Sequence, residues 1–221
     1  RAMFQIISPL VAKALNDGDA PTLLKLLKKS ANNLLLISGL LFLLINLNLN
    51  DFYAWVNLGD YSVALEVVLI VSLGKLFTMS LGCLNNIITN SKHYAYVFWF
   101  STTSAILAVV LNLYLIQWYG IIGAAYATLM VIVLINFLKI LLVQLRFKIN
   151  PYSKKTFLTL GIVLILYFTI SEVSFEFDPF VSLVLRSILI TAAFSILAYL
   201  LKLTVDLQQF LSKILPFLKK D

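Results

Sequence analysis

Six apolar segments of roughly the length that crosses a lipid bilayer as a helix constrain this 221-residue chain more than any other feature. A bilayer core of about 30 Å requires roughly 20 apolar helical residues per crossing. The segments stay apolar throughout, whereas the strands of a membrane barrel alternate apolar and polar residues. The sequence therefore predicts an all-α protein, a polytopic membrane helix bundle with six spanning helices. The predicted segments are 31–48, 63–89, 94–117, 121–145, 156–171 and 181–203.

The composition agrees with the membrane class. The chain is 61% hydrophobic and only 12% charged, and its mean hydropathy is +0.97, values that lie outside those of ordinary soluble domains. The net charge of +7 would suggest nucleic-acid binding only if the basic residues gathered on one soluble face. Because they are distributed among the connections between apolar segments, we expect no nucleic-acid partner.

Residues 4–15 have the pattern of the end of a further helix, in which Pro9 would introduce a kink. Because the chain starts at Arg1 inside this pattern, we expect it to be a fragment of a longer protein. We predict a single membrane domain over 1–221. Its parts are the end of a truncated helix and a basic cytoplasmic linker (1–30), four spanning helices (31–145), two appended spanning helices (156–203) and an amphipathic cytoplasmic tail (204–221).

The charges of successive connections alternate in sign. Lysine and arginine occur in the connections at 13–30, 90–93 and 146–155 and after residue 203, whereas acidic residues occur at 46–62 and 172–178. Short basic connections remain in the cytoplasm. This pattern predicts that the basic set faces the cytoplasm, together with the C-terminus.

Two basic segments have the pattern of helices that lie on the inner membrane surface. The stretch DGDAPTLLKLLKKS combines a helix start at Asp19 and Pro21 with alternating leucine and lysine. In the tail after residue 203, the apolar residues fall on one helical stripe. Each segment either attracts anionic lipid or serves as an ordinary juxtamembrane anchor.

Several stretches of the sequence resemble one family of membrane transporters. They are SLGKLFTMSLGCLNNIITNSKHYAYVFWF, NLYLIQWYGIIGAAYATL, KINPYSKKT and PLVAKALNDGD. Together they resemble the C-terminal half of bacterial polysaccharide-biosynthesis membrane proteins. These are lipid-linked oligosaccharide flippases of the multidrug/oligosaccharidyl-lipid/polysaccharide exporter superfamily. The most specific stretch is WYGIIGAAYAT at 118–128.

The resemblance implies that the six segments are helices nine to fourteen of that family, with a first bundle supplied by the same chain. It also implies a central cavity that opens alternately to each side of the bacterial cytoplasmic (inner) membrane. The implied substrate is oligosaccharide on isoprenoid diphosphate, such as a lipopolysaccharide O-antigen unit, moved from the inner to the outer leaflet. The alternative within the superfamily is a cation-coupled multidrug antiporter.

Lys75 is the one charged residue of the apolar stretch VVLIVSLGKLFTMSLGCL at 67–84. On a helical wheel Ser72, Thr78 and Asn86 share its face, and Glu66 lies opposite. A lysine at the bilayer centre costs about 3 kcal/mol, so we expect it to face a polar interior. One hypothesis is that Lys75 binds the substrate diphosphate, with those three residues as hydrogen-bonding neighbours. The other is an interior ion pair or bonding to backbone carbonyls.

Other polar or small intramembrane residues have simpler interpretations. The small residues Gly120, Gly123, Ala124 and Ala127 predict close helix packing. Polar residues on the segment 94–117 predict interhelical hydrogen bonds; they are Ser101, Ser104 and Asn112. Two cations have predicted roles as well: Lys139 extends toward the cytoplasmic interface, and Arg186 pairs with Glu172, Glu176 or Asp178.

Catalysis is not expected. The chain has one histidine, His93, and one cysteine, Cys83, and no cluster of Cys, His and carboxylate with metal-ligand spacing. We therefore expect no enzyme activity, no cofactor and no metal, and we expect His93 to be a solvated turn residue. The antiporter alternative requires an intramembrane carboxylate, for which Glu66 is the candidate in this sequence.

Overall fold

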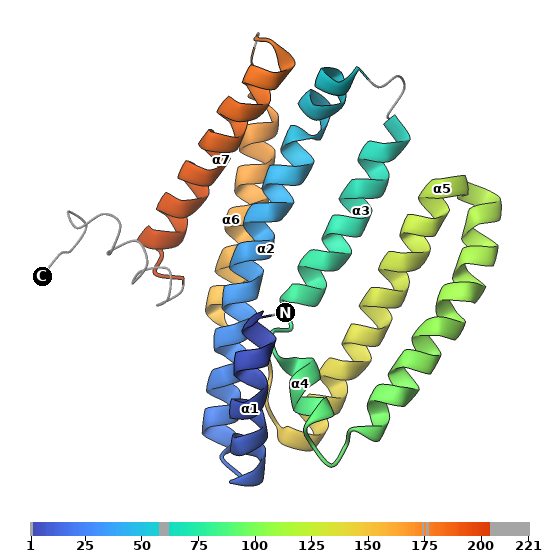
Figure 1. The fold of residues 1–221 in the computed structure, drawn as a ribbon, viewed down its shortest axis with the longest axis vertical. Helices are drawn as coiled ribbons and strands as arrows, with labels where there is room; N and C mark the ends of the chain where they lie inside the picture. The colour runs from blue at the N-terminus through green and yellow to red at the C-terminus, as the bar shows by residue number, and fades with distance from the viewer. Residues whose placement is uncertain (1, 58–61, 174, 176, 204–221) are drawn as a thin grey trace, which may run out of the picture.

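The computed structural model describes residues 2–57, 62–173, 175 and 177–203, and within them the regular elements are all α-helices (Figure 1). The helices are α1 Ala2–Asn16, α2 Ala20–Val56, α3 Ser62–Met79, α4 Leu84–Thr89, α5 Ala95–Phe147, α6 Lys154–Ser171 and α7 Pro179–Leu200. Among the described residues, α2, α5, α6 and α7 are long and apolar enough to span a membrane. The all-α class is confirmed, and the long apolar helices are those of a membrane protein.

Helix α2 is the central element of the bundle. It packs against α1, α3, α6 and α7, while α5 packs against α3 and α4. One apolar cluster joins α2 to α6 and α7 around Leu43, Val163 and Phe194. A second cluster joins α1, α2, α4 and the end of α5 around Leu27 and Ile87. The two clusters follow one another along α2, so this helix connects the two parts of the core.

Helix α5 reverses direction at Gly120. The φ/ψ angles of this glycine are 57° and −136°, outside the helical region, and Figure 1 shows two antiparallel arms on either side of the reversal. A positive φ is easily adopted only by glycine. At Gly123 a Cβ would lie 2.0 Å from the carbonyl oxygen of Leu115 in the first arm, so the arms meet closely there. The close packing predicted for Gly123 is confirmed, and the two arms match the predicted segments 94–117 and 121–145.

The predicted segment 63–89 is not one helix. Helix α3 ends at Met79, the chain turns at residues 80–83, and α4 continues below it (Figure 1). Gly82 has a φ of +60°, and a Cβ at this position would lie 2.4 Å from the backbone nitrogen of Ala31. Ser30 Oγ of α2 also accepts a hydrogen bond of 2.9 Å from the Cys83 N–H. The break therefore lets the chain touch the backbone of α2.

No helix end marks the predicted boundary at residue 30 between a basic linker and a first spanning helix. Helix α2 is continuous from Ala20 to Val56 and begins as predicted: Asp19 Oδ1 accepts from Thr22 N at 2.9 Å, with Pro21 in the first turn. Leu23, Leu27 and Ala31 are buried in one line across the predicted boundary. Since this stripe continues without a glycine or proline at the junction, nothing ends the helix there. The predicted amphipathic tail at 204–221 lies outside the described residues.

Candidate functional site

A groove of about 620 Å³ lies between α2 and α3. Its walls are apolar except for three residues, Ser38 from α2 and Ser72 and Lys75 from α3. The apolar side chains that line it are Leu34, Ile37, Leu41, Phe42, Ile45, Val67, Val68, Val71, Leu76 and Met79. None of the lining residues carries a carboxylate. The groove thus combines a long hydrocarbon surface with one positive charge.

Lys75 lies one helical turn before the end of α3 at Met79 and is exposed. Among the described residues, neither a carboxylate nor a carbonyl oxygen pairs with its ammonium group. The simpler hypothesis, in which backbone carbonyls satisfy this lysine, is therefore not what the described part of the chain shows. The charge of Lys75 remains available at the wall of the groove.

Ser72 is held in place by a residue that the sequence interpretation did not single out. Asn46 of α2 donates from Nδ2 to Ser72 Oγ at 2.9 Å and to the Phe42 carbonyl at 2.8 Å. Ser72 Oγ in turn donates to the Leu69 carbonyl at 2.9 Å. These bonds join α2 to α3 beside Lys75. An amide side chain within an apolar segment was the signal available for Asn46, because such groups bond across helices.

Thr78 and Asn86 do not line the groove. Thr78 Oγ1 accepts from Asn136 Nδ2 of α5 at 3.1 Å and donates to the Gly74 carbonyl at 2.9 Å, so it belongs to the contact between α3 and α5. Asn86 lies on α4, beyond the break at 80–83. The helical wheel assumed a continuous helix, and the break ends that periodicity. Of the predicted site residues, only Lys75 and Ser72 share the groove.

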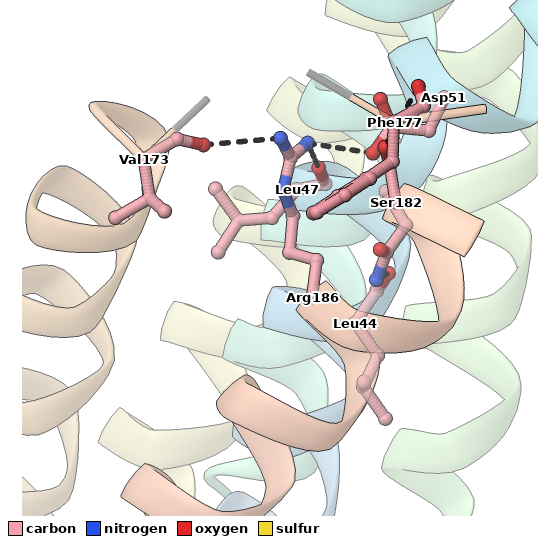
Figure 2. Close-up of polar contacts among 8 residues, drawn as sticks. Leu44, Leu47, Asp51, Val173, Phe177, Ser182 and Arg186 are labelled. Atoms are coloured by element: carbon pink, nitrogen blue, oxygen red, sulfur yellow. Dashed lines mark hydrogen bonds and ion pairs between the residues drawn. The ribbon is translucent and has the colours of Figure 1, made fainter. Parts of the chain in front are cut away.

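Arg186 forms a second polar cluster, in which the described carboxylate partner is Asp51. Its Nη1 lies 2.9 Å from Asp51 Oδ2 near the end of α2 and donates to the Leu47 carbonyl at 2.8 Å, as Figure 2 shows. Nη2 donates to the Val173 carbonyl at 3.1 Å, and the guanidinium carbon lies 5.8 Å from the centre of the Phe175 ring. Of the predicted partners, neither Glu172 nor Asp178 pairs with Arg186, and Glu176 lies outside the described residues.

Asp51 was not predicted as a partner because the sequence interpretation ended the helix too early. The sequence placed Asp51 in a connection at 46–62, whereas α2 continues to Val56 and carries Asp51 on its last turns. Asp178 is used differently, because its Oδ1 accepts from Phe180 N at 3.0 Å and caps α7. The arginine cluster therefore ties α2, α7 and the α6–α7 connection together and is a structural contact.

The remaining polar candidates are peripheral to the groove. Burial, followed by the charges of Arg146 and Lys92, lowers the pKa of His93 below its ordinary value, and its ring lies edge-on to Phe147 at 5.9 Å. Asn112 donates to the Ala108 carbonyl of its own helix at 2.6 Å, so the interhelical bond predicted for it is not formed with a described residue. The described residues hold no group of three or more His, Cys, Asp or Glu that could bind a metal ion.

Comparison with known proteins gives no relative. No protein-family model, no curated protein and no solved structure matches this chain.

Proposed function

We propose that this chain is part of a membrane transporter that flips isoprenoid-diphosphate-linked oligosaccharide from the inner to the outer leaflet of the bacterial inner membrane. The observation that carries the proposal is Lys75, an exposed cation without a partner among the described residues, on the wall of an otherwise apolar groove. A polyprenyl diphosphate has the same two features, a hydrocarbon chain and an anionic group. The sequence resemblance to flippases favours the same function.

The chemistry of the groove suits such a ligand. Its volume of about 620 Å³ falls in the range of about 300–1,000 Å³ that is typical of ligand pockets. The leucine, isoleucine and valine side chains offer van der Waals contact to isoprene units, and Lys75 offers a compact point charge to a diphosphate oxygen. Ser72, held by Asn46, lies one turn before Lys75 and supplies a hydroxyl beside it.

The proposal includes a topology and its partners. Six passes result if the two arms of α5 each cross the membrane and α3 with α4 forms one interrupted pass. The turns that carry lysine then face the cytoplasm, as does the C-terminus. Transport by alternating access requires a second bundle opposite this one, so the proposed partners are membrane lipids and an N-terminal bundle of the same chain. The mechanism uses no cofactor and no metal.

The alternative is a cation-coupled antiporter for drugs or other small molecules. Such coupling uses an intramembrane carboxylate, and Glu66 of α3 is exposed but is not among the residues that line the groove. An anionic substrate beside Lys75 agrees better with the charges of the groove than a cationic drug does.

The test measures lipid flipping by the full-length protein in vesicles. A fluorescent sugar on polyprenyl diphosphate is chemically quenched from outside, and the rate of quenching of the inner-leaflet pool gives the flipping rate. Loss of a charge-assisted hydrogen bond of about 1.5–3 kcal/mol predicts that Lys75→Ala slows flipping roughly 10- to 100-fold. Lys75→Arg keeps the charge and should retain much of the activity.

Lys139→Ala is the matched control, because Lys139 is a partly buried lysine of α5 that does not line the groove. It should flip lipid at the wild-type rate. If Lys75→Ala is as fast as this control, the role of Lys75 is disproved. If the wild-type protein fails to flip the lipid but moves a lipophilic cation against a sodium or proton gradient, the antiporter alternative replaces the proposal.

A further inference from the structure

A second pocket, of about 490 Å³, lies where the first turns of α2 meet the start of α6 and the end of α7. We refer to it as the basic pocket, and it shares no residue with the groove at Lys75. Figure 1 shows α6 beginning beside the lower part of α2. The wall of the basic pocket contains four lysines, two asparagines and a leucine, and no carboxylate. These residues are Lys25, Lys28, Lys29, Asn32, Asn33, Lys155 and Leu203.

The positive charge of the basic pocket comes from two helices. Lys25 and Lys28 are spaced at i and i+3 on α2, so they share one face of that helix, and Lys155 stands on the first turn of α6. Lys29 is engaged in another interaction, so the charge offered to a ligand comes from the other three lysines. The N-terminus of α6 adds the positive end of a helix dipole. Like charges at this spacing repel one another, and a bound anion would relieve that repulsion.

Hydrogen bonds within the protein orient two of the donors that line the basic pocket. Asn32 Oδ1 accepts from Ser153 Oγ at 3.2 Å and from Thr156 Oγ1 at 3.0 Å. Because two hydroxyl groups occupy its oxygen, the amide nitrogen of Asn32 is the end that remains to donate. Lys155 Nζ donates to the Lys202 carbonyl at 2.7 Å, which positions this ammonium and leaves it further N–H groups. The pocket thus has both charged and neutral donors in fixed places.

Exposed apolar side chains lie next in the chain to residues of the basic pocket, on α6 and at the end of α7. Phe157 and Leu158 follow Lys155 on α6, and Leu200 and Leu201 precede Lys202 at the end of α7. A small soluble anion would make no use of these residues, whereas acyl chains would cover them. Basic pockets between spanning helices on the cytoplasmic side are typical sites for anionic lipid headgroups.

From these contacts we infer that the basic pocket binds the phosphate headgroup of an anionic phospholipid, whose acyl chains lie along the apolar side chains of α6 and α7. The ammonium groups of Lys25, Lys28 and Lys155 and the amide of Asn32 would donate to the phosphate oxygens. This inference does not depend on the proposed transport function, because it concerns a different surface of the bundle.

The test measures the binding of phosphatidylglycerol to the full-length protein in detergent by native mass spectrometry, with phosphatidylcholine and inorganic phosphate as comparison ligands. In the wild type, phosphatidylglycerol should bind more tightly than both. The triple variant Lys25→Gln/Lys28→Gln/Lys155→Gln should bind it about 10- to 100-fold more weakly, because each lysine contributes attraction near an anionic lipid. The matched control is Lys13→Gln/Lys92→Gln/Lys148→Gln, which removes the same charge from exposed lysines outside the pocket and should keep wild-type binding.

A second variant tests the basic pocket even if the triple variant does not fold. Asn32→Asp keeps the oxygen that accepts from Ser153 and Thr156 but replaces the amide donor with negative charge, so it should fold and bind phosphatidylglycerol at least several-fold more weakly. Equal loss in the pocket and control triple variants would show general charge attraction and overturn the inference. Equally tight binding of inorganic phosphate, or wild-type lipid affinity in Asn32→Asp, would overturn it as well.

Discussion

At the scale of single residues, the arrangement around Arg186 shows how a charge is accommodated in this bundle. Its guanidinium has an anionic partner in Asp51 and carbonyl partners in Leu47 and Val173. Both side chains of the ion pair are largely shielded, with relative exposures of 13% and 19%. Lys75 differs in that it is exposed and pairs with none of the described residues. This contrast separates a cation that stabilises the fold from one that is available to a ligand.

Asp51→Leu should destabilise the protein, because it leaves the shielded charge of Arg186 without its counter-ion. Removal of one partner of a buried pair costs about 3–5 kcal/mol, and the partial exposure of this pair places the expected loss at or below the lower end of that range. A thermal unfolding assay of the purified protein in detergent should show a clearly lower midpoint. Glu172→Gln is the control, because the exposed Glu172 is a partner suggested by sequence that does not contact Arg186, and its midpoint should not change.

The double variant Asp51→Leu/Arg186→Met decides whether the ion pair itself explains the loss. Replacing both partners of a buried pair with apolar residues is often neutral or stabilising. The double variant should therefore recover much of the midpoint that Asp51→Leu loses. A double variant less stable than Asp51→Leu would mean that the bonds of Arg186 to Leu47 and Val173 dominate.

Part of the candidate site could be predicted from the sequence. Lys75 and Ser72 are three residues apart on one regular helix, so the wheel placed them together correctly. Thr78 lies 60° to the side of Lys75 on the wheel, close enough to count as the same face, but a bond to Asn136 directs it to α5. The partner helix decides this, and a single sequence does not contain that information. The pair of Arg186 with Asp51 was missed for another reason, because the sequence placed Asp51 in a connection and not on α2.

At the scale of elements, the break between α3 and α4 is the main departure from the predicted helices. The sequence SLGCL at 80–84 contains one glycine and no proline, and an isolated glycine within an apolar segment is compatible with a continuous helix. The break depends instead on contact with α2, where Gly82 meets Ala31 and Ser30 bonds to Cys83. By contrast, the starts of α2 and α6 follow from local capping residues, and that of α2, at Asp19, was predicted.

Ser30→Ala should weaken the contact between α2 and the turn that separates α3 from α4. The variant leaves the buried Cys83 N–H without a partner, at a cost of about 1–3 kcal/mol. Cys83 is the sole cysteine of the chain and is buried, so its rate of modification by a maleimide reports local opening. The rate should rise roughly 5- to 100-fold in Ser30→Ala.

Ser38→Ala is the matched control for this measurement. Its hydroxyl donates to the Leu35 carbonyl of the same helix at 3.2 Å and makes no bond to α4. Cys83 should react at the wild-type rate in this variant. An unchanged rate in Ser30→Ala would show that the bond to Cys83 does not hold the break closed.

At the scale of the whole molecule, the alternating charges of the sequence correspond to two ends of the bundle. The turns between α1 and α2, between α4 and α5, and between α5 and α6 lie at one end in Figure 1, and the reversal at Gly120 and the α6–α7 connection lie at the other. Most of the lysines of the connections occur at the first end, together with Asp17 and Asp19, and the α6–α7 connection at the second end carries acids. A polytopic helical architecture could be predicted because length and hydropathy fix each helix locally. The lateral order of the helices could not, since it depends on which faces meet.

This arrangement makes the orientation in the membrane testable with single cysteines. In a Cys83→Ala background, Lys92→Cys and Lys148→Cys mark the basic end, and Gln117→Cys and Phe177→Cys mark the opposite end. All four positions are exposed. Because short basic connections remain in the cytoplasm, an impermeant maleimide added to intact spheroplasts should label positions 117 and 177 and leave 92 and 148 unlabelled. Permeabilising the membrane should make all four reactive. Labelling of 92 and 148 in intact spheroplasts would reverse the proposed orientation, and labelling of only one of 117 and 177 would rule out the six-pass arrangement, because that arrangement places both positions on the same side.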